Sequence, residues 1–221
     1  MLDKISRRFW RIISRSSGID YATIKVTQKE IENEAYKKYL GGQAPKWEGR
    51  GRFQLDFLRK MGLRSNSKLL DVGCGPGRAA VHFIDFLQEG NYTGVDNNED
   101  FIAIARRVMS HEQLARKRPI FMVISNFDFS KLPDSPDYVM AFSVLNHCSP
   151  KLRMRFFKSI DSPLRVGSKI FISHARWFTP DYLSESGLRV CDEHKGADFN
   201  ASAYGWDNGD EISPILELIK V

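Results

Sequence analysis

Short apolar runs alternate with amphipathic stretches through the last two thirds of the chain. Five runs have the length of buried strands and fall at residues 68–72, 92–96, 120–125, 138–143 and 169–173. Between and after them, apolar residues recur at helical spacing over about residues 77–89, 98–109, 150–160 and 179–186. This alternation predicts a parallel sheet with helices on both of its faces.

Two further strand candidates, residues 188–192 and 214–221, follow without a long helix between them. Only a stretch rich in glycine, aspartate and aromatic residues, 194–212, separates them, so we expect an antiparallel closing hairpin. The sequence therefore predicts an α/β fold, a doubly wound and mostly parallel seven-stranded sheet with an antiparallel last strand.

The first 65 residues show helical patterns and no strand alternation. A helix predicted over residues 27–40 starts with Thr27 and Glu30 at capping-box spacing, and residues 47–61 hold another. Residues 3–15 read as a basic amphipathic helix that either packs on the body of the protein or lies on a membrane surface. We therefore expect a helical extension or lid, residues 1–65, before a core of residues 66–221.

Composition and charge limit the class of protein. The chain has 221 residues, 42% of them hydrophobic, and no apolar run of the roughly 18 residues that a membrane span needs. Its charged start does not resemble a secretory signal, and three widely spaced cysteines predict free thiols. We expect a cytoplasmic protein, with residues 1–15 as a candidate peripheral membrane contact.

The positive charge is concentrated in the first third of the chain. Residues 1–70 carry a net charge of +9 and residues 71–221 a net charge of −3, which gives +6 in total. A basic surface of this kind attracts nucleic acid, anionic lipid or a phosphorylated substrate, but it is also typical of ordinary solvated helices.

The most specific pattern is the segment 69–78, LLDVGCGPGR, in which a glycine-rich turn joins an apolar strand to a helix start. Glycines let the backbone approach a ligand closely. The next strand ends in Asp96, 23 residues after Gly73, where a carboxylate can bind both hydroxyls of a ribose. A dinucleotide fingerprint needs a small residue where the chain has Arg78, which disfavours a nicotinamide cofactor.

The spacing of these glycines, two residues after Asp71, resembles motif I of the class I S-adenosylmethionine-dependent methyltransferases. Asp96 matches the ribose-binding acid of that family, and residues 128–133 are similar to its D-x-x-x-L-P stretch. Residues 137–143 and 156–172 resemble its fourth strand and the helix, turn and fifth strand that follow. The resemblance covers about residues 67–221 and implies a Rossmann-like fold, S-adenosylmethionine as cofactor and S-adenosylhomocysteine as product.

The resemblance also implies a set of cofactor-binding residues, namely Asp71, Gly73, Cys74, Gly75, Gly77, Arg78, Asp96, Asn97, Asp128, Phe129 and Ser143. Asp128 would accept from the adenine amino group, and the next N–H would reach the ring, with the Phe129 side chain free to cover the adenine face. Asn126 lies close enough to compete with Asp128. From the residues alone, Asp96 could instead cap the next helix, and Cys74 could be a buried filler.

Candidates for the chemistry follow the fourth and fifth strands. His147 is a candidate general base because imidazole titrates near neutral pH, but it could also cap or pack the next helix. His174 is a second candidate. The chain shows no Asp and Asn cluster of the metal-dependent O-methyltransferases, and Ser-Val-Leu-Asn stands where nucleobase N-methylating enzymes have N/D-P-P-Y.

We therefore expect metal-independent methyl transfer to a small-molecule acceptor, at an oxygen or nitrogen of a metabolite, sugar or lipid-linked intermediate. Aromatic residues of the extension (Tyr36, Tyr39, Trp47 and Phe53) and of the segment 177–211 would line the site. Two alternatives stay open: methylation of RNA or protein through the basic first third, although no added nucleic-acid-binding domain is present, and a non-catalytic cofactor-binding or partner-binding module. The oligomeric state stays open too.

Overall fold

A computed structural model describes residues 23–40, 44–110, 112–173, 177–195 and 214–221 of the chain. The basic helix expected at residues 3–15 and the stretch 196–213 therefore lie outside the described residues. Within the described part, no helix is both long enough and apolar enough to cross a membrane.

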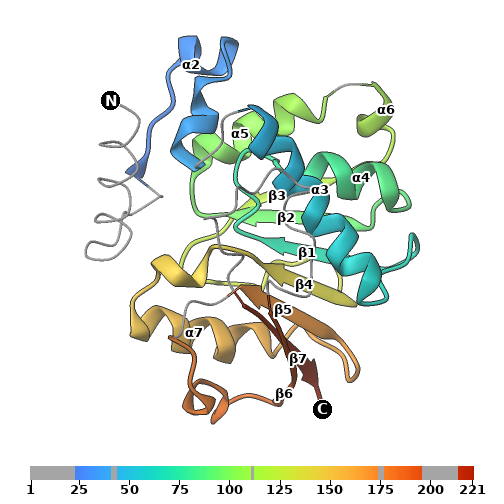
Figure 1. The fold of residues 1–221 in the computed structure, drawn as a ribbon, viewed down its shortest axis with the longest axis vertical. Helices are drawn as coiled ribbons and strands as arrows, with labels where there is room; N and C mark the ends of the chain where they lie inside the picture. The colour runs from blue at the N-terminus through green and yellow to red at the C-terminus, as the bar shows by residue number, and fades with distance from the viewer. Residues whose placement is uncertain (1–22, 41–43, 111, 174–176, 196–213) are drawn as a thin grey trace.

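The described strands form one mixed sheet in the order β3-β2-β1-β4-β5-β7-β6 (Figure 1). The strands are β1 (Leu69–Val72), β2 (Tyr92–Asp96), β3 (Ile120–Val123), β4 (Tyr138–Ala141), β5 (Lys169–Ser173), β6 (Leu188–His194) and β7 (Ile215–Lys220). The pairs among β1 to β5 are parallel, whereas β7 runs antiparallel to both β5 and β6. The predicted seven-stranded sheet with an antiparallel last strand is thus confirmed.

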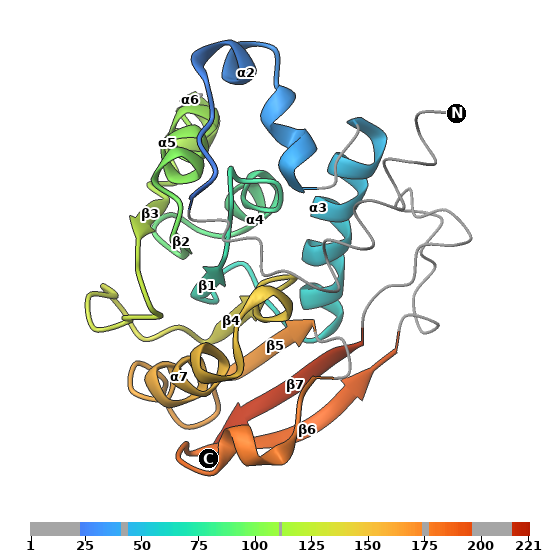
Figure 2. The same cartoon turned by 90° about the vertical axis from the view of Figure 1, so that its left-hand side faces the viewer.

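Helices cover both faces of this sheet (Figures 1 and 2). Side chains alternate between the faces of a strand, so Leu69 packs with α3 (Ala44–Lys60), α4 (Ala80–Phe86) and α5 (Glu99–Val108), whereas Leu70 packs with α7 (Pro150–Ile160). A short α6 (Glu112–Ala115) precedes β3. Since Phe57 and Leu58 of α3 lie in the core beside the strands, this helix is one of the layers that support the sheet.

Three predicted helices differ from the observed ones. The segment 27–40 begins with the predicted capping box but is divided into α2 (Gln28–Glu32) and the 3-10 helix η2 (Ala35–Leu40). The division falls where the Asn33 side chain accepts from the Ala35 N–H and Glu34 has a φ of 56°, a local turn that competes with the helix.

The other two helices are shorter than their apolar spacing predicted. The helix expected from residue 77 begins only at Ala80, because Gly75 and Gly77 have positive φ and hold the chain in a turn. The helix expected over 179–186 is the 3-10 helix η4 (Pro180–Leu183).

The order of the strands reverses at the neighbouring pair β1 and β4. From this pair, β2 and β3 extend the sheet to one side, and β5, β7 and β6 extend it to the other. Ligands of doubly wound sheets bind at such a switch point. Gly73 follows β1 there, and a Cβ on this glycine would collide with Cγ2 of Val144, three residues after the end of β4. The fold therefore brings the glycine loop against the segment that follows β4.

Candidate cofactor-binding site

The glycine loop is folded back onto the end of β2. Gly73, Gly75 and Gly77 have φ values of 73°, 55° and 94°, a region that residues with a Cβ rarely adopt. The Gly73 and Cys74 N–H groups both donate to the Val95 carbonyl, at 2.7 and 3.1 Å. The glycines thus supply the backbone conformation and the close approach. The Gly73 and Cys74 N–H groups are already used in hydrogen bonds within the protein.

Asp96 is held rigidly at the end of β2. One carboxylate oxygen accepts from the Gly75 N–H and the other from the Asn98 N–H, both at 2.9 Å. Burial raises the pKa of this carboxyl, and the backbone N–H donors oppose that rise. Each oxygen of a carboxylate has two acceptor positions, so the geometry leaves room for two ribose hydroxyls.

The alternative that Asp96 caps the next helix is wrong, because Asn98 is the N-cap of α5. Its Oδ1 accepts from the Phe101 N–H at 3.0 Å. The predicted cofactor residue Asn97 is exposed and lies between this cap and the carboxylate.

Asp71 lies beneath the loop and is only 3% exposed. Burial raises the pKa of this carboxyl from 3.8 to about 7, against the opposing effect of the Tyr92 hydroxyl, which donates to it at 2.8 Å. Cys74 is buried in the same cluster, and burial raises the pKa of its thiol well above the ordinary value. A thiol with a raised pKa is a poor nucleophile, so the location of Cys74 supports the buried-filler interpretation.

Asp71 gives the fold a pH dependence. A carboxyl whose pKa is raised on folding stabilises the native state below its unfolded pKa near 4, and this stability is lost as the pH rises through about 7. Asp71→Asn resembles the protonated form and still accepts from Tyr92, so it should be the more stable protein at pH 8 by about 5–10 °C in Tm. Thermal melts of both proteins from pH 5 to 8 test this, and parallel curves would contradict it.

Arg78 brings a positive charge to the loop. Its guanidinium donates to the Leu40 carbonyl at 3.3 Å and lies 5.6 Å from the centre of the Trp47 ring. Burial, followed by the neighbouring Arg50, lowers the pKa of Arg78 to about 10. Among the described residues, the Asp71 carboxyl opposes this fall electrostatically, and a partly buried cation at the loop fits an anionic ligand.

The residues expected at the adenine edge follow β3. Asp128 is exposed, and its carboxylate accepts from the N–H and the hydroxyl of Ser130, which lowers its pKa. The Phe129 ring is 3% exposed and packs against Phe127 and Phe156. The expectation that this ring covers adenine is therefore wrong, because the ring is buried in the aromatic core. The Phe129 backbone still lies in the turn that follows Asp128.

Residues at the carboxyl ends of β4 and β5 form the border of the candidate site next to the adenine edge. Ser143 has a φ of 59° and donates its N–H to the Ser173 hydroxyl at 2.6 Å, which joins the two strand ends. His147 is half-buried on the 3-10 helix η3 (Leu145–His147), and burial lowers its pKa, so the imidazole is neutral near pH 7. The cap of α7 is Ser149, not His147. His174 lies outside the described residues.

The sequence patterns did not reveal how this border is held together. The Trp177 indole donates to Oδ1 of Asn146 at 2.6 Å, and the Arg153 guanidinium lies 4.4 Å from the Trp177 ring centre while donating to the Leu145 carbonyl. Phe178 and Tyr182, from the segment expected to line the site, instead pack on α7 through Phe157. No spacing rule connects Asn146 with Trp177, since they lie 31 residues apart.

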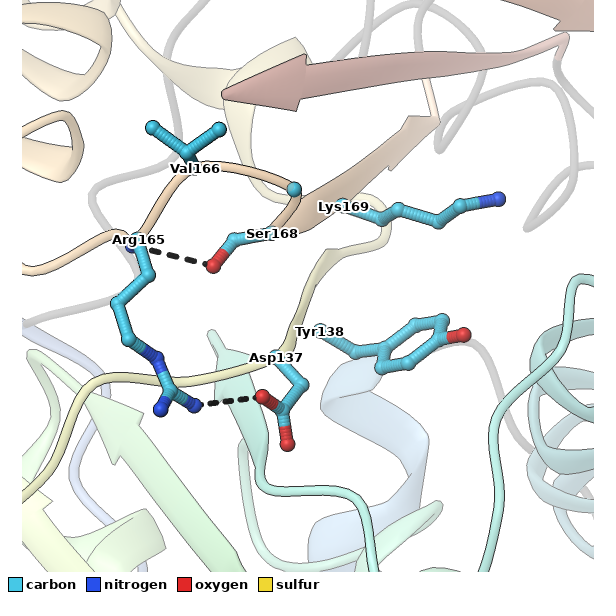
Figure 3. A pocket seen from close by; sticks show the side chains of 7 residues that line it. Asp137, Tyr138, Arg165, Val166, Ser168 and Lys169 are labelled. Atoms are coloured by element: carbon cyan, nitrogen blue, oxygen red, sulfur yellow. Dashed lines mark hydrogen bonds and ion pairs between the residues drawn. The ribbon is translucent and has the colours of Figure 1, made fainter. Parts of the chain in front are cut away.

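A hollow of about 370 Å³ lies at the opposite end of the strands, where β4 and β5 begin (Figure 3). Its charged side chains are already paired, Arg165 with Asp137 at 2.6 Å and Lys169 with Glu217 at 2.8 Å. We do not assign the cofactor to it. Within the described ranges, no three His, Cys, Asp or Glu side chains gather as metal ligands would.

A glycine loop and a carboxylate at the switch point of a doubly wound sheet define a Rossmann-like cofactor domain. Residues 69–167 match the family model of the methyltransferase domain. A sterol 24-C-methyltransferase of Aspergillus fumigatus is 32% identical over 124 residues, 56% of this chain and 32% of that protein. A trans-aconitate 2-methyltransferase of Mycolicibacterium gilvum is 23% identical over 134 residues, 58% of this chain and 52% of that protein.

Among solved structures, a magnesium protoporphyrin IX methyltransferase from Synechocystis PCC 6803 superposes with a TM-score of 0.60 at 15% identity, covering 97% of this chain and 96% of that one. At this identity the likeness concerns the fold. The chain spans about a third to a half of the length of the two curated relatives. Residues 69–167 thus match a methyltransferase domain, and the fold of the chain is that of a Rossmann-like methyltransferase.

Proposed function

We propose that the protein transfers the methyl group of S-adenosylmethionine to an oxygen or nitrogen of a small-molecule acceptor. The observation that carries this proposal is the arrangement around the switch point: Asp96, held by two backbone N–H groups at the end of β2, contacts the glycine loop, and the partly buried Arg78 directly follows that loop. A ligand with a ribose and a carboxylate suits these two side chains.

The residues fit the cofactor at each of its parts. Asp96 would bind the ribose hydroxyls, Arg78 the carboxylate of the methionine part, and Asp128 with the Phe129 N–H the adenine edge. The loop carrying Asp71, Gly73, Cys74, Gly75 and Gly77 would form the floor, with Asn97 and Ser143 at its borders. When bound, the cofactor supplies a methyl group on a positively charged sulfur.

The chain itself must bind the acceptor, align it and accept a proton from it. The neutral His147 imidazole, at the end of η3, can accept the proton of an acceptor hydroxyl. Ser143 and Ser173 fix the strand ends on which an acceptor would rest. His174 is the second candidate for this role.

The extension would act as the lid of this site. Tyr36 and Trp47 pack with Phe101 and Ile104 of α5, and a Cβ on Gly75 would lie 3.3 Å from Leu40. The names of the relatives, a sterol and a trans-aconitate methyltransferase, support a small-molecule acceptor over RNA or protein. A cytoplasmic location, with residues 1–15 touching a membrane surface, is part of the proposal.

The direct test is acceptor-dependent formation of S-adenosylhomocysteine. The purified protein is incubated with S-adenosylmethionine and a panel of sterol-like, carboxylic acid and sugar acceptors, with tRNA and peptide pools as separate arms. Turnover on a small molecule supports the proposal, and turnover only on RNA or peptide supports the alternative acceptor class. Cofactor binding without turnover in any arm would favour the non-catalytic module.

Arg78→Gln tests the carboxylate assignment. Loss of one charged hydrogen-bonding partner should weaken S-adenosylmethionine binding about 10- to 100-fold. Decarboxylated S-adenosylmethionine should bind the variant and the wild type equally, because it lacks the group that Arg78 would hold. Calorimetry with both ligands makes this comparison, with the exposed Arg64→Gln as the control. Equal weakening of both ligands would contradict the assignment.

A further inference from the structure

Residues 24–27 of the extension form a short strap across the first turn of α5 (Figures 1 and 2). The side-chain amide of Asn98 donates to the Ile24 carbonyl at 2.8 Å. The Val26 N–H donates to a carboxylate oxygen of Asp100 at 3.0 Å. Both bonds link residues that are 74 positions apart in the chain.

Three polar groups of Asn98 bind three different parts of the chain. Its N–H donates to Asp96, its Oδ1 caps α5, and its Nδ2 holds the strap. The residue is 1% exposed, so none of these bonds has water as a ready replacement. One buried residue, through its backbone N–H and its side-chain amide, therefore connects the candidate ribose carboxylate to the extension.

The other end of the extension contacts the opposite side of the loop. The Leu40 carbonyl accepts from Arg78, and the Leu40 side chain lies against Gly75. Tyr36 anchors the middle through its contact with the Trp47 ring, with centroids 6.2 Å apart. The segment from the strap to Leu40 thus reaches from the side of Asp96 to the side of Arg78.

We propose that Asn98 is a positioning residue that couples cofactor binding to docking of the strap, with Asp100 as the second attachment point. This inference rests on the proposed cofactor. The Asn98 N–H holds Asp96 in place for the ribose, while its amide holds the strap that closes the same end of the site. Linkage then requires reciprocity: if docking of the strap strengthens cofactor binding by some factor, bound cofactor must favour docking of the strap by the same factor.

Asn98→Ser separates this role from helix capping. Serine is about as good an N-cap as asparagine, but its side chain is too short to reach the Ile24 carbonyl. We expect S-adenosylhomocysteine to be released about fivefold faster from the variant, as for the loss of one hydrogen bond, together with a small fall in Tm. Stopped-flow displacement measures the release rate.

Asp100→Ala and Glu99→Ala form a matched pair on the same turn. Both remove one negative charge from the start of α5, but only Asp100 contacts the strap, and Glu99 is exposed. Release should be faster from Asp100→Ala and unchanged in Glu99→Ala. This pair tests the coupling even where Asn98→Ser lowers the Tm, and equal release rates in both variants would overturn it.

Hydrogen exchange at the Val26 amide gives the reciprocal readout. Cofactor should slow this exchange about fivefold in the wild type and have no such effect in Asn98→Ser. Wild-type protein that fails to bind cofactor at all would refute the proposed function. Wild-type protein that binds cofactor, with unchanged release from Asn98→Ser and unaltered exchange at Val26, would refute the coupling alone.

Discussion

Asp96→Ala should weaken S-adenosylmethionine binding by at least about a hundredfold. The carboxylate is placed to accept from both ribose hydroxyls, and each hydrogen bond to a charged group contributes roughly 1.5–3 kcal/mol. Two such bonds correspond to a factor of about 10² to 10⁴ in Kd. Isothermal calorimetry on the wild type and the variant measures the change directly.

The side chain also has a structural role, which the controls must separate from binding. Asp96 accepts from the Gly75 and Asn98 N–H groups, so its removal loosens the loop as well. Asp96→Asn keeps one acceptor oxygen and should bind the cofactor with intermediate affinity. Asp85→Ala removes an exposed carboxylate from α4 and should bind like the wild type. Near wild-type affinity of folded Asp96→Ala would show that the ribose lies elsewhere.

The features that could be predicted from the sequence are those that depend on local patterns. Alternation of apolar runs and helical stretches is a property of neighbouring residues, and it predicted the strands, their layers and the antiparallel closure. The spacing of Gly73, Gly75 and Gly77 placed the loop, because the backbone conformation there requires glycine.

The features that were missed depend on competition and on long-range contacts. The helix over 27–40 breaks because Asn33 satisfies the backbone locally, a choice that helical spacing does not reveal. Phe129 is held by Phe156, which belongs to a distant helix. The strap bonds of Asn98 and Asp100 join segments that only the folded sheet brings together. Such contacts have no signal in a single sequence.

Gly73→Ala should be the most damaging single substitution in the loop. The new Cβ would collide with Cγ2 of Val144, and alanine at a φ of 73° pays a backbone penalty of about 1–2 kcal/mol. Overpacking adds about 1–3 kcal/mol. We expect a fall in Tm of about 5–15 °C and loss of measurable cofactor binding. Thermal melts measure the first effect and calorimetry the second.

Two further variants divide this effect into its causes. Gly90 has a φ of 76° but nothing within 4 Å of its Cβ position, so Gly90→Ala measures the backbone penalty alone. Val144→Ala removes the colliding carbon, so the double variant with Gly73→Ala should regain the collision part of the lost stability and part of the cofactor binding. The single Val144→Ala variant closes the double-mutant cycle. If the two losses simply add, the contact between the glycine loop and the segment after β4 is not the reason that position 73 requires glycine.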